Sequence, residues 1–291
     1  MSVFELTGPT LATYWRPGRC DLEMQSVQID QTQLLVSRWS FGTASLHHLP
    51  RSIQRQRLLR AVVNAGFTHF DTSPFYGYGL AERELSGLIK HRRADLTLAT
   101  KVGLYPPGHV SHGSLGVWYR KAVGRVVRRV SAPRVDWSIA EARKSLTQSL
   151  RRLGTDYVDV LYLHEPDAML IAADQFLRWL EDEQVKGRIR YWGLAGLARP
   201  MMTLVDGGSR LAHVLQVKDS VGGHEANALI EAGRKLQFTY GYLSDARKSS
   251  LAVGWSDFVR TILARNPYGS VIISTRCTER VAKFVDGSLP G

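Results

Sequence analysis

The sequence predicts an α/β barrel, a closed ring of eight parallel strands that alternate with helices. Three observations favour this fold class. From about residue 50 onward, short runs rich in Val, Ile, Leu and Tyr alternate with segments of helical period. Eight strand-like runs can be distinguished, which is the number that closes such a barrel. A chain of 291 residues with 44% hydrophobic residues supplies an ample core for one.

An additional hairpin is predicted ahead of the barrel. Two β-prone runs within residues 25–36 are separated by a polar turn at residues 30–33. We expect this hairpin to cap the floor of the barrel. Residues 1–24 fit no barrel element and are predicted to form an N-terminal arm. Residues 25–291 are predicted to form a single (β/α)8 barrel domain, because no Pro-, Gly- or Ser-rich linker interrupts them.

The barrel elements follow in order along the chain. The predicted strands lie near residues 37–42, 67–71, 96–101, 157–163, 189–194, 212–217, 237–240 and 270–273. The helix after Ser138 is the most clearly delimited. Ser138 and Glu141 form a capping box, apolar residues follow at helical spacing, and Gly154 lies past the end. The next run is a continuous apolar strand that ends at His164.

Composition narrows the class of protein. The first residues lack a basic region followed by an apolar one, and no run is apolar over the length of a bilayer. We therefore expect a soluble, cytoplasmic protein with no membrane partner. Cys20 and Cys277 are too few and too far apart to indicate a disulfide framework or a metal site.

Basic residues exceed acidic ones by 12 (38 minus 26). Such a surplus attracts phosphorylated ligands, nucleic acid or anionic membranes without indicating which. The densest basic run, Arg120 to Arg134, is interleaved with Ala and Val, and no recognised nucleic-acid-binding module surrounds it. We interpret it as a solvated amphipathic segment and expect no nucleic-acid partner. The oligomeric state stays open.

Four polar residues lie at the ends of three neighbouring predicted strands. Asp71 and Tyr76 stand where the second strand meets its loop, Lys101 ends the third strand and His164 ends the fourth. Catalytic groups of α/β barrels collect at this rim. Each residue alone has a structural interpretation, as a cap, a packed aromatic, a solvated lysine or a core histidine. Their common position indicates a catalytic site.

The four residues suggest acid–base chemistry. A tyrosine has a pKa near ~10 and is by itself a slow proton donor at neutral pH. An ammonium group on Lys101 is expected to lower the pKa of Tyr76, and Asp71 to keep that lysine charged and in place. His164 can then orient the carbonyl oxygen that receives the tyrosine proton.

Five segments together carry a family resemblance. They are Gly42-Thr43, residues 71–77 (DTSPFYG), 99–103 (ATKVG), 153–164 (LGTDYVDVLYLH) and 186–193 (KGRIRYWG). In this order they resemble the aldo-keto reductase family, and the resemblance covers roughly residues 26–285. It implies an oxidoreductase with Asp71, Tyr76, Lys101 and His164 as catalytic tetrad. Tyr76 would serve as general acid/base while a hydride passes between nicotinamide C4 and an aldehyde, ketone or sugar carbonyl.

The resemblance also implies a nicotinamide cofactor that spans the barrel mouth. It would be NADPH, with NADH as the alternative. Gln216 matches a glutamine that supports the carboxamide, Tyr240 an aromatic that stacks on the ring, and Arg280 an arginine that contacts the 2′-phosphate. The full set of expected cofactor contacts is Gly42, Thr43, Asp71, Gln216, Tyr240, Ser274, Thr275, Arg276 and Arg280.

Two departures from the family pattern concern the cofactor. Ala195-Gly196 stands where the family commonly has a Ser-Asn pair, so anchoring of the carboxamide is expected to fall largely to Gln216. Lys283-Phe284 replaces the Glu-Asn that usually faces the adenine.

The small-molecule substrate is expected to contact aromatic residues near the mouth, namely Tyr105, Trp118, Tyr119 and Trp39. Two alternative functions stay open. One is an aldose or sugar 1-dehydrogenase working in the oxidative direction, because the same tetrad serves both directions. The other is a cofactor-sensing regulatory barrel of low turnover, because the carboxamide pair is lost.

Overall fold

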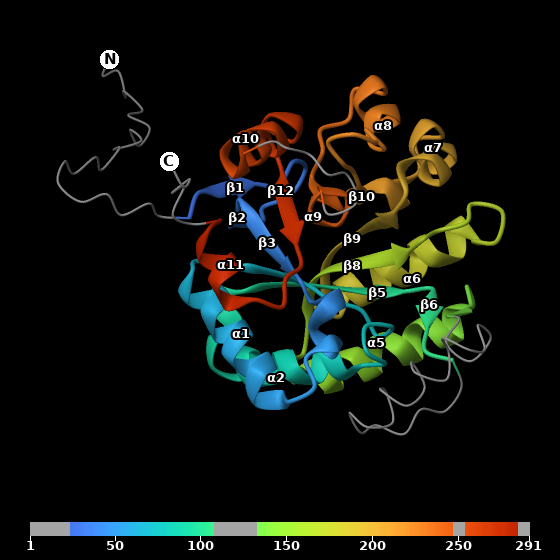
Figure 1. Cartoon of the computed structure of the whole chain (residues 1–291). Helices are drawn as coiled ribbons and strands as arrows, with labels where there is room; N and C mark the ends of the chain where they lie inside the picture. The colour runs from blue at the N-terminus through green and yellow to red at the C-terminus, as the bar shows by residue number, and fades with distance from the viewer. Residues whose placement is uncertain (1–23, 108–132, 247–253, 285–291) are drawn as a thin grey trace, which may run out of the picture.

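A closed barrel of eight parallel strands forms the centre of the molecule, as the sequence predicts (Figure 1). The computed structural model describes residues 24–107, 133–246 and 254–284. The barrel strands are β3 (Trp39–Gly42), β4 (His69–Asp71), β5 (Thr97–Val102), β8 (Val158–His164), β9 (Ile189–Gly196), β10 (Val214–Lys218), β11 (Phe238–Tyr240) and β12 (Ser270–Ile273). β12 pairs with β3 and so closes the ring.

The predicted strands agree with the observed ones to within two residues at each end. The first predicted strand begins too early because Ser37 already belongs to the hairpin, where it pairs with Ser26. β9 extends two residues further than predicted, to Gly196, because its last residues continue to pair with β10.

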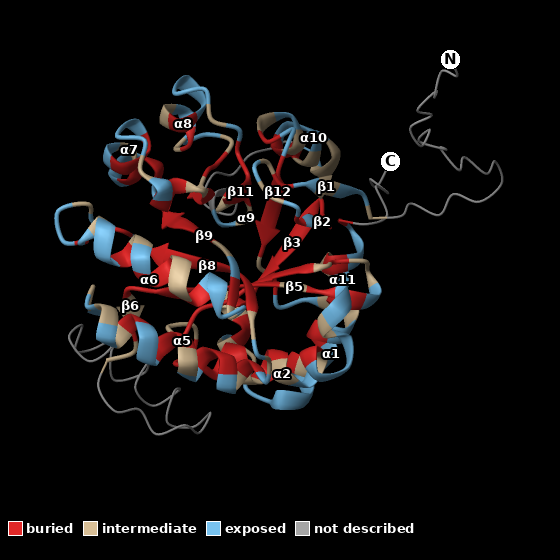
Figure 2. Ribbon diagram, turned by 180° about the vertical axis from the view of Figure 1, so that it is seen from behind, coloured by how far each residue is buried: buried red, intermediate tan, exposed pale blue. Residues whose placement is uncertain are grey.

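Helices surround the barrel and bury one face each against it (Figure 2). They are α1 (Ser52–Asn64), α2 (Leu80–Arg92), α5 (Ile139–Leu153), α6 (Ala173–Val185), α7 (Ala198–Asp206), α8 (Asn227–Glu231), α9 (Tyr242–Ala246), α10 (Trp255–Arg265) and α11 (Thr278–Ala282). Short 3-10 turns are η1 (Thr43–His48), η2 (Arg93–Asp95) and η3 (Arg210–Ala212). A small two-stranded antiparallel sheet pairs β6 (Leu104–Tyr105) with β7 (Arg134–Val135).

The limits of α5 follow the predicted signals. The Ser138 hydroxyl accepts a hydrogen bond from the backbone N–H of Glu141, which satisfies one free amide of the first turn. Gly154 ends the helix in the left-handed conformation, with φ 68°. The following strand, β8, is buried along its whole length.

The predicted N-terminal hairpin plugs the barrel floor. β1 (Ser26–Gln28) and β2 (Leu35–Ser37) pair antiparallel. Ile29 and Leu34 are buried among side chains of the barrel interior, including Tyr162 and Phe238. The Gln237 side chain donates to the backbone oxygen of Asp30 at 2.8 Å and ties the turn to β11. The floor is therefore filled by apolar packing, and polar groups gather at the other end.

A buried carboxylate fixes α2 against the strand that carries Lys101. Glu82 accepts hydrogen bonds from Thr100 of β5 at 2.8 Å and from Arg152 of α5 at 2.6 Å. Because Thr100 precedes Lys101, these bonds hold that strand end in place.

Among the described residues, no helix is long and apolar enough to span a bilayer.

Candidate active site

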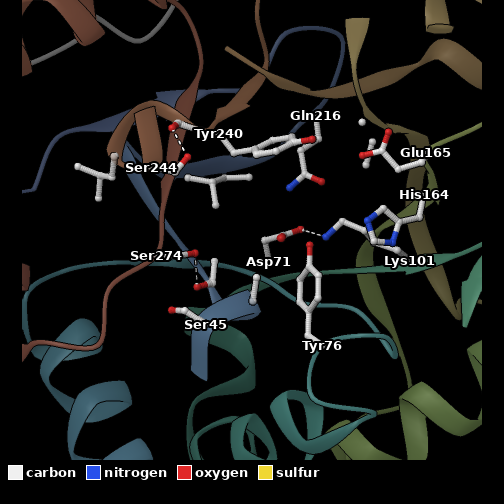
Figure 3. Close-up of a pocket in the computed structure, with 17 residues that line it drawn as sticks. Ser45, Asp71, Tyr76, Lys101, His164, Glu165, Gln216, Tyr240, Ser244 and Ser274 are labelled. Atoms are coloured by element: carbon white, nitrogen blue, oxygen red, sulfur yellow. Dashed lines mark hydrogen bonds and ion pairs between the residues drawn. The ribbon is translucent and has the colours of Figure 1, made fainter. Parts of the chain in front are cut away.

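The four residues of the predicted tetrad line one cavity at the mouth of the barrel, with a volume of about 400 Å³ (Figure 3). Asp71 is the last residue of β4, Lys101 lies near the end of β5 and His164 ends β8, while Tyr76 comes from the loop after β4. Parallel strands end at the same rim, so residues far apart in sequence meet there.

Lys101 and Asp71 form a buried ion pair. Lys101 Nζ donates to Asp71 Oδ1 and, at 3.0 Å, to the backbone oxygen of Thr72. Their side chains are 2% and 5% exposed, so each charge depends on the other for compensation. Burial lowers the pKa of Lys101, and the Asp71 carboxylate opposes that shift. The pair therefore presents a fixed ammonium group to the cavity wall.

Tyr76 lies close to both this pair and His164. Lys101 Nζ is 4.9 Å from the centre of the Tyr76 ring, and the rings of Tyr76 and His164 are perpendicular with centres 6.1 Å apart. Burial, followed by the charge of Asp71, raises the pKa of Tyr76 well above its usual value. The prediction that Lys101 lowers this pKa is wrong for the free protein, because Asp71 neutralises the ammonium and burial dominates. Tyr76 therefore keeps its proton.

His164 is a neutral imidazole. Burial and the charge of Lys101 lower its pKa well below the ordinary value. Its Nδ1 atom is buried and has no hydrogen-bond partner among the described residues. A neutral imidazole offers one donor and one acceptor, so this ring can give a hydrogen bond to an oxygen atom in the cavity without adding charge.

Several predicted cofactor residues line the same cavity from the other strands. Gln216 of β10, Tyr240 of β11, Ser274 after β12 and Gly42 of β3 all contribute to its wall. The Ser274 hydroxyl donates to the backbone oxygen of Gly42 at 2.7 Å and links the two strand ends. Burial raises the pKa of Tyr240, so its phenol is also neutral.

Other predicted cofactor residues lie beside the cavity. Thr43 is fully buried and donates to the backbone oxygen of Asp71 at 3.0 Å, so it supports the catalytic loop from behind. Thr275 accepts a hydrogen bond from the backbone N–H of Cys277 at 3.2 Å. Arg276 is exposed just before α11, and Arg280 is half-buried within it. Neither arginine forms an ion pair with a described carboxylate, so both are free to meet a phosphate.

Two predicted substrate residues lie away from the cavity. Trp39 is 4% exposed and packs on Phe284, with ring centres 4.8 Å apart, because it points outward from β3 toward α11. Tyr105 is 3% exposed in the β6–β7 sheet, and the guanidinium group of Arg134 lies 5.3 Å from the centre of its ring. Both side chains are packed away from the cavity, so substrate contact by these two residues stays a prediction that the described cavity does not support. Trp118 and Tyr119 lie outside the described residues, as does most of the basic run.

The structure adds cavity residues that the sequence reasoning missed. The most polar is Glu165, which follows His164, lines the cavity and is exposed to solvent. Its adjacency to a predicted catalytic residue at a strand end was an available signal. The others are Ala44, Ser45, Gly241, Leu243, Ser244 and Ile272, together with the Ala195-Gly196 pair discussed above. Leu243 and Ser244 come from α9, whose position over the rim has no sequence signature.

The fold and this polar cavity define an α/β-barrel enzyme. The sequence model of the aldo/keto reductase family matches residues 38–208, more than half of the chain. The chain belongs to this family, and it is an oxidoreductase of the aldo-keto reductase type.

Two curated relatives indicate the range of activities among similar proteins. A D-threo-aldose 1-dehydrogenase of a Pseudomonas species is 29% identical over 268 residues, covering 88% of this chain and 73% of the relative. An L-galactose dehydrogenase of Arabidopsis thaliana is 28% identical over 185 residues, covering 61% of this chain and 50% of the relative. For the second, the match therefore spans only half of the relative's length.

Solved structures agree with the fold. An aldo-keto reductase of Bacillus halodurans, in its holo form, superposes with a TM-score of 0.71 at 20% identity, covering 91% of each chain. An aldo-keto reductase of Klebsiella pneumoniae in complex with NADPH gives a TM-score of 0.63 at 22% identity, covering 91% of this chain and 89% of that one.

Proposed function

We propose that this protein transfers a hydride between NADPH and the carbonyl carbon of an aldehyde, ketone or sugar, with Tyr76 as the proton donor to the carbonyl oxygen. One observation carries the proposal. A protonated tyrosine, a neutral histidine and a buried lysine–carboxylate pair face one cavity, beside Gln216 and Tyr240.

The cavity suits a nicotinamide ring. Its volume of about 400 Å³ lies in the range of small-molecule sites and leaves room for a small carbonyl compound. The Gln216 amide would hold the carboxamide, and Tyr240 would pack on the ring. Ser274, Arg276 and Arg280 lie on the side where the phosphates would bind. When bound, the reduced cofactor supplies the hydride, which is chemistry that side chains lack.

Protonation states favour Tyr76 as an acid. In reduction, the carbonyl oxygen gains negative charge and takes the proton of the phenol hydroxyl. Lys101 then stabilises the phenolate that remains, and Asp71 keeps the ammonium group in position. In the oxidative direction the phenolate takes the proton back from the alcohol. The raised pKa in the free protein keeps the phenol protonated before reduction. It also makes the phenol a weaker acid, so the proposed transfer depends on Lys101 stabilising the phenolate.

His164 would orient the substrate. Its neutral ring can donate to the carbonyl oxygen while that oxygen faces Tyr76. An imidazolium ion would compete with the phenol as a proton donor, so the lowered pKa of His164 supports Tyr76 in that role.

An aldose 1-dehydrogenase is the second candidate, supported by the similarity to D-threo-aldose 1-dehydrogenase. The same tetrad would serve both directions. The hydride acceptor would be a small carbonyl compound in reduction, and the hydride donor would be a sugar in oxidation. A regulatory barrel of low turnover is the remaining alternative, and measured turnover separates it from an enzyme.

The test is a titration of the purified chain with NADPH and NADH, followed by absorbance assays with aldehydes, ketones and aldoses. We expect NADPH to bind more tightly than NADH and at least one class of carbonyl or sugar to be turned over. Tight binding without turnover on any substrate would favour the regulatory alternative. A protein that binds neither cofactor would contradict the proposal.

A further inference from the structure

Glu165 has an unusual backbone conformation at the edge of the active-site cavity. Its φ is 51°, in the left-handed region that non-glycine residues seldom occupy. Its backbone N–H donates to the oxygen of Ala195 at 2.7 Å, which ties the end of β8 to β9. Strained residues of this kind concentrate at functional sites. The strain here turns a long acidic side chain onto the cavity wall.

The Glu165 carboxylate occupies the space beside Gly196. A Cβ atom on Gly196 would lie 2.6 Å from Glu165 Oε2 and 2.9 Å from Cδ, closer than real Cβ contacts allow. Gly196 also has φ 156°, which disfavours other residues. Glu165 therefore fills space next to position 196, where the family resemblance implies an Asn.

The surroundings of Glu165 permit a charged carboxylate. Burial raises its pKa, whereas a hydrogen bond from the Leu197 backbone and the charge of Lys101 lower it. Its oxygens can only accept hydrogen bonds when ionised. Figure 3 shows Glu165 and Gln216 on the opposite side of the Asp71–Lys101 pair from Tyr76. Both side chains line the same cavity.

We propose that Glu165 replaces the missing Ser-Asn pair as the partner of Gln216 at the nicotinamide carboxamide, and that its charge favours the oxidised cofactor over the reduced one. This inference rests on the proposed function. The carboxylate would accept a hydrogen bond from the carboxamide N–H, which is stronger when the acceptor is charged. The oxidised ring carries a positive charge and the reduced ring is neutral, so only the oxidised form gains Coulomb attraction.

The consequence concerns the direction of hydride transfer on the protein. Preferential binding of the cationic ring makes the bound reduced cofactor a stronger hydride donor, since losing the hydride creates the charge that Glu165 stabilises. The overall equilibrium in solution is unchanged. A tenfold preference corresponds to about 30 mV for a two-electron couple. Glu165 would thus adapt this site to carbonyl reduction.

Isothermal titration calorimetry with NADP+ and NADPH tests the inference. In the Glu165→Gln variant, which keeps the shape, we expect NADP+ to bind about tenfold more weakly and NADPH to change less than twofold. Glu165→Asp keeps the charge and should retain most of the preference for NADP+. Glu181→Gln, on the outer surface of α6, is the matched control and should leave both affinities unchanged.

The outcomes separate the two proposals. If the wild-type protein binds both cofactors and Glu165→Gln leaves the ratio of their affinities unchanged, the inference is wrong and the proposed function stands. An equal loss for both cofactors also overturns it, because it indicates a structural role. If the wild type binds neither cofactor, the proposed function is overturned and this inference with it.

Discussion

The two halves of the barrel rim differ in how they are built. On the side of β4, β5 and β8, the cavity wall carries ionisable side chains, of which Lys101 and Asp71 are buried and bonded to each other and His164 is buried. On the side of β9 to β12, it consists mainly of neutral groups, namely Ala195, Gly196, Gln216, Tyr240 and Ser274. The first half carries the four residues of the predicted tetrad, and the second half carries Ala195-Gly196, the predicted departure from the family pattern.

The difference has a physical cause. A buried charge that loses its partner costs several kcal/mol, so each member of the Lys101–Asp71 pair requires the other. A neutral group that would contact the cofactor through a single hydrogen bond can be replaced by a side chain from a neighbouring position. Glu165, which lies against Gly196, is the proposed example. We therefore expect the proposed catalytic half of the rim to tolerate few substitutions, and the proposed cofactor half to tolerate those that preserve shape and charge.

The largest expected effect lies in the catalytic half. Tyr76→Phe should lower kcat by about 10³-fold, because it removes the proton donor and leaves the cavity shape intact. Cofactor affinity should change less than twofold. Steady-state kinetics and a cofactor titration measure both. Tyr162→Phe is the control, since Tyr162 is buried inside the barrel and its hydroxyl has no partner among the described residues. An undiminished kcat in the Tyr76 variant would exclude the proposed acid.

The ion pair gives the next largest effect, on stability as well as activity. Lys101→Met leaves Asp71 buried without a partner, and we expect the free energy of unfolding to fall by about 3 kcal/mol. Denaturant unfolding measures it. The double variant Lys101→Met/Asp71→Asn should recover part of the stability without recovering activity. Lys186→Met, in an exposed pair with Asp182, should cost less than about 1 kcal/mol. An equal loss of unfolding free energy in Lys101→Met and Lys186→Met would contradict the greater importance of the buried pair.

A smaller effect is expected at the phosphate end of the cofactor half. Arg280→Ala should weaken NADPH about tenfold and leave NADH nearly unchanged, because only NADPH carries the 2′-phosphate. Fluorescence titration with both cofactors measures the ratio. Arg260→Ala, on the exposed face of α10, is the control. Parallel losses for the two cofactors would refute a specific phosphate contact.

The smallest effect is a pH dependence. Burial raises the pKa of Glu165, so its carboxylate ionises at a higher pH than an ordinary glutamate. As pH rises through that pKa, the ratio of NADP+ to NADPH affinity should increase, by about threefold between pH 5 and 8. Of the groups near Glu165, His164 stays neutral because its pKa is lowered, and Tyr76 and Tyr240 stay protonated because their pKa values are raised.

Calorimetry at several pH values measures this dependence. The use of a ratio cancels titration of the 2′-phosphate, which both cofactors share. In Glu165→Gln the ratio should not depend on pH. A pH-dependent ratio in that variant would assign the effect to another group.

Sequence reasoning captured the barrel because its signals are local and repeated. Strand composition, the cap at Ser138 and the stop at Gly154 each depend on a few neighbouring residues. The meeting of Asp71, Lys101 and His164 followed from strand ends that share one rim. The outward direction of Trp39 and the burial of Tyr105 did not follow, because they depend on packing against α11 and β7.

The protonation of Tyr76 and the role of Glu165 were also beyond sequence reasoning. The first depends on the balance between burial and two opposite charges at defined distances. The second depends on a left-handed backbone that turns one side chain against Gly196. Both are properties of three-dimensional geometry that no spacing of residue types encodes.

The hairpin below the barrel has a kinetic consequence. Ile29 and Leu34 pack inside the barrel and fill its floor. A reactant is therefore expected to reach Tyr76 through the rim. If the dinucleotide binds across that rim, as proposed, it shares the entrance with the substrate. We therefore expect the two to bind in a compulsory order, with the dinucleotide binding first and dissociating last.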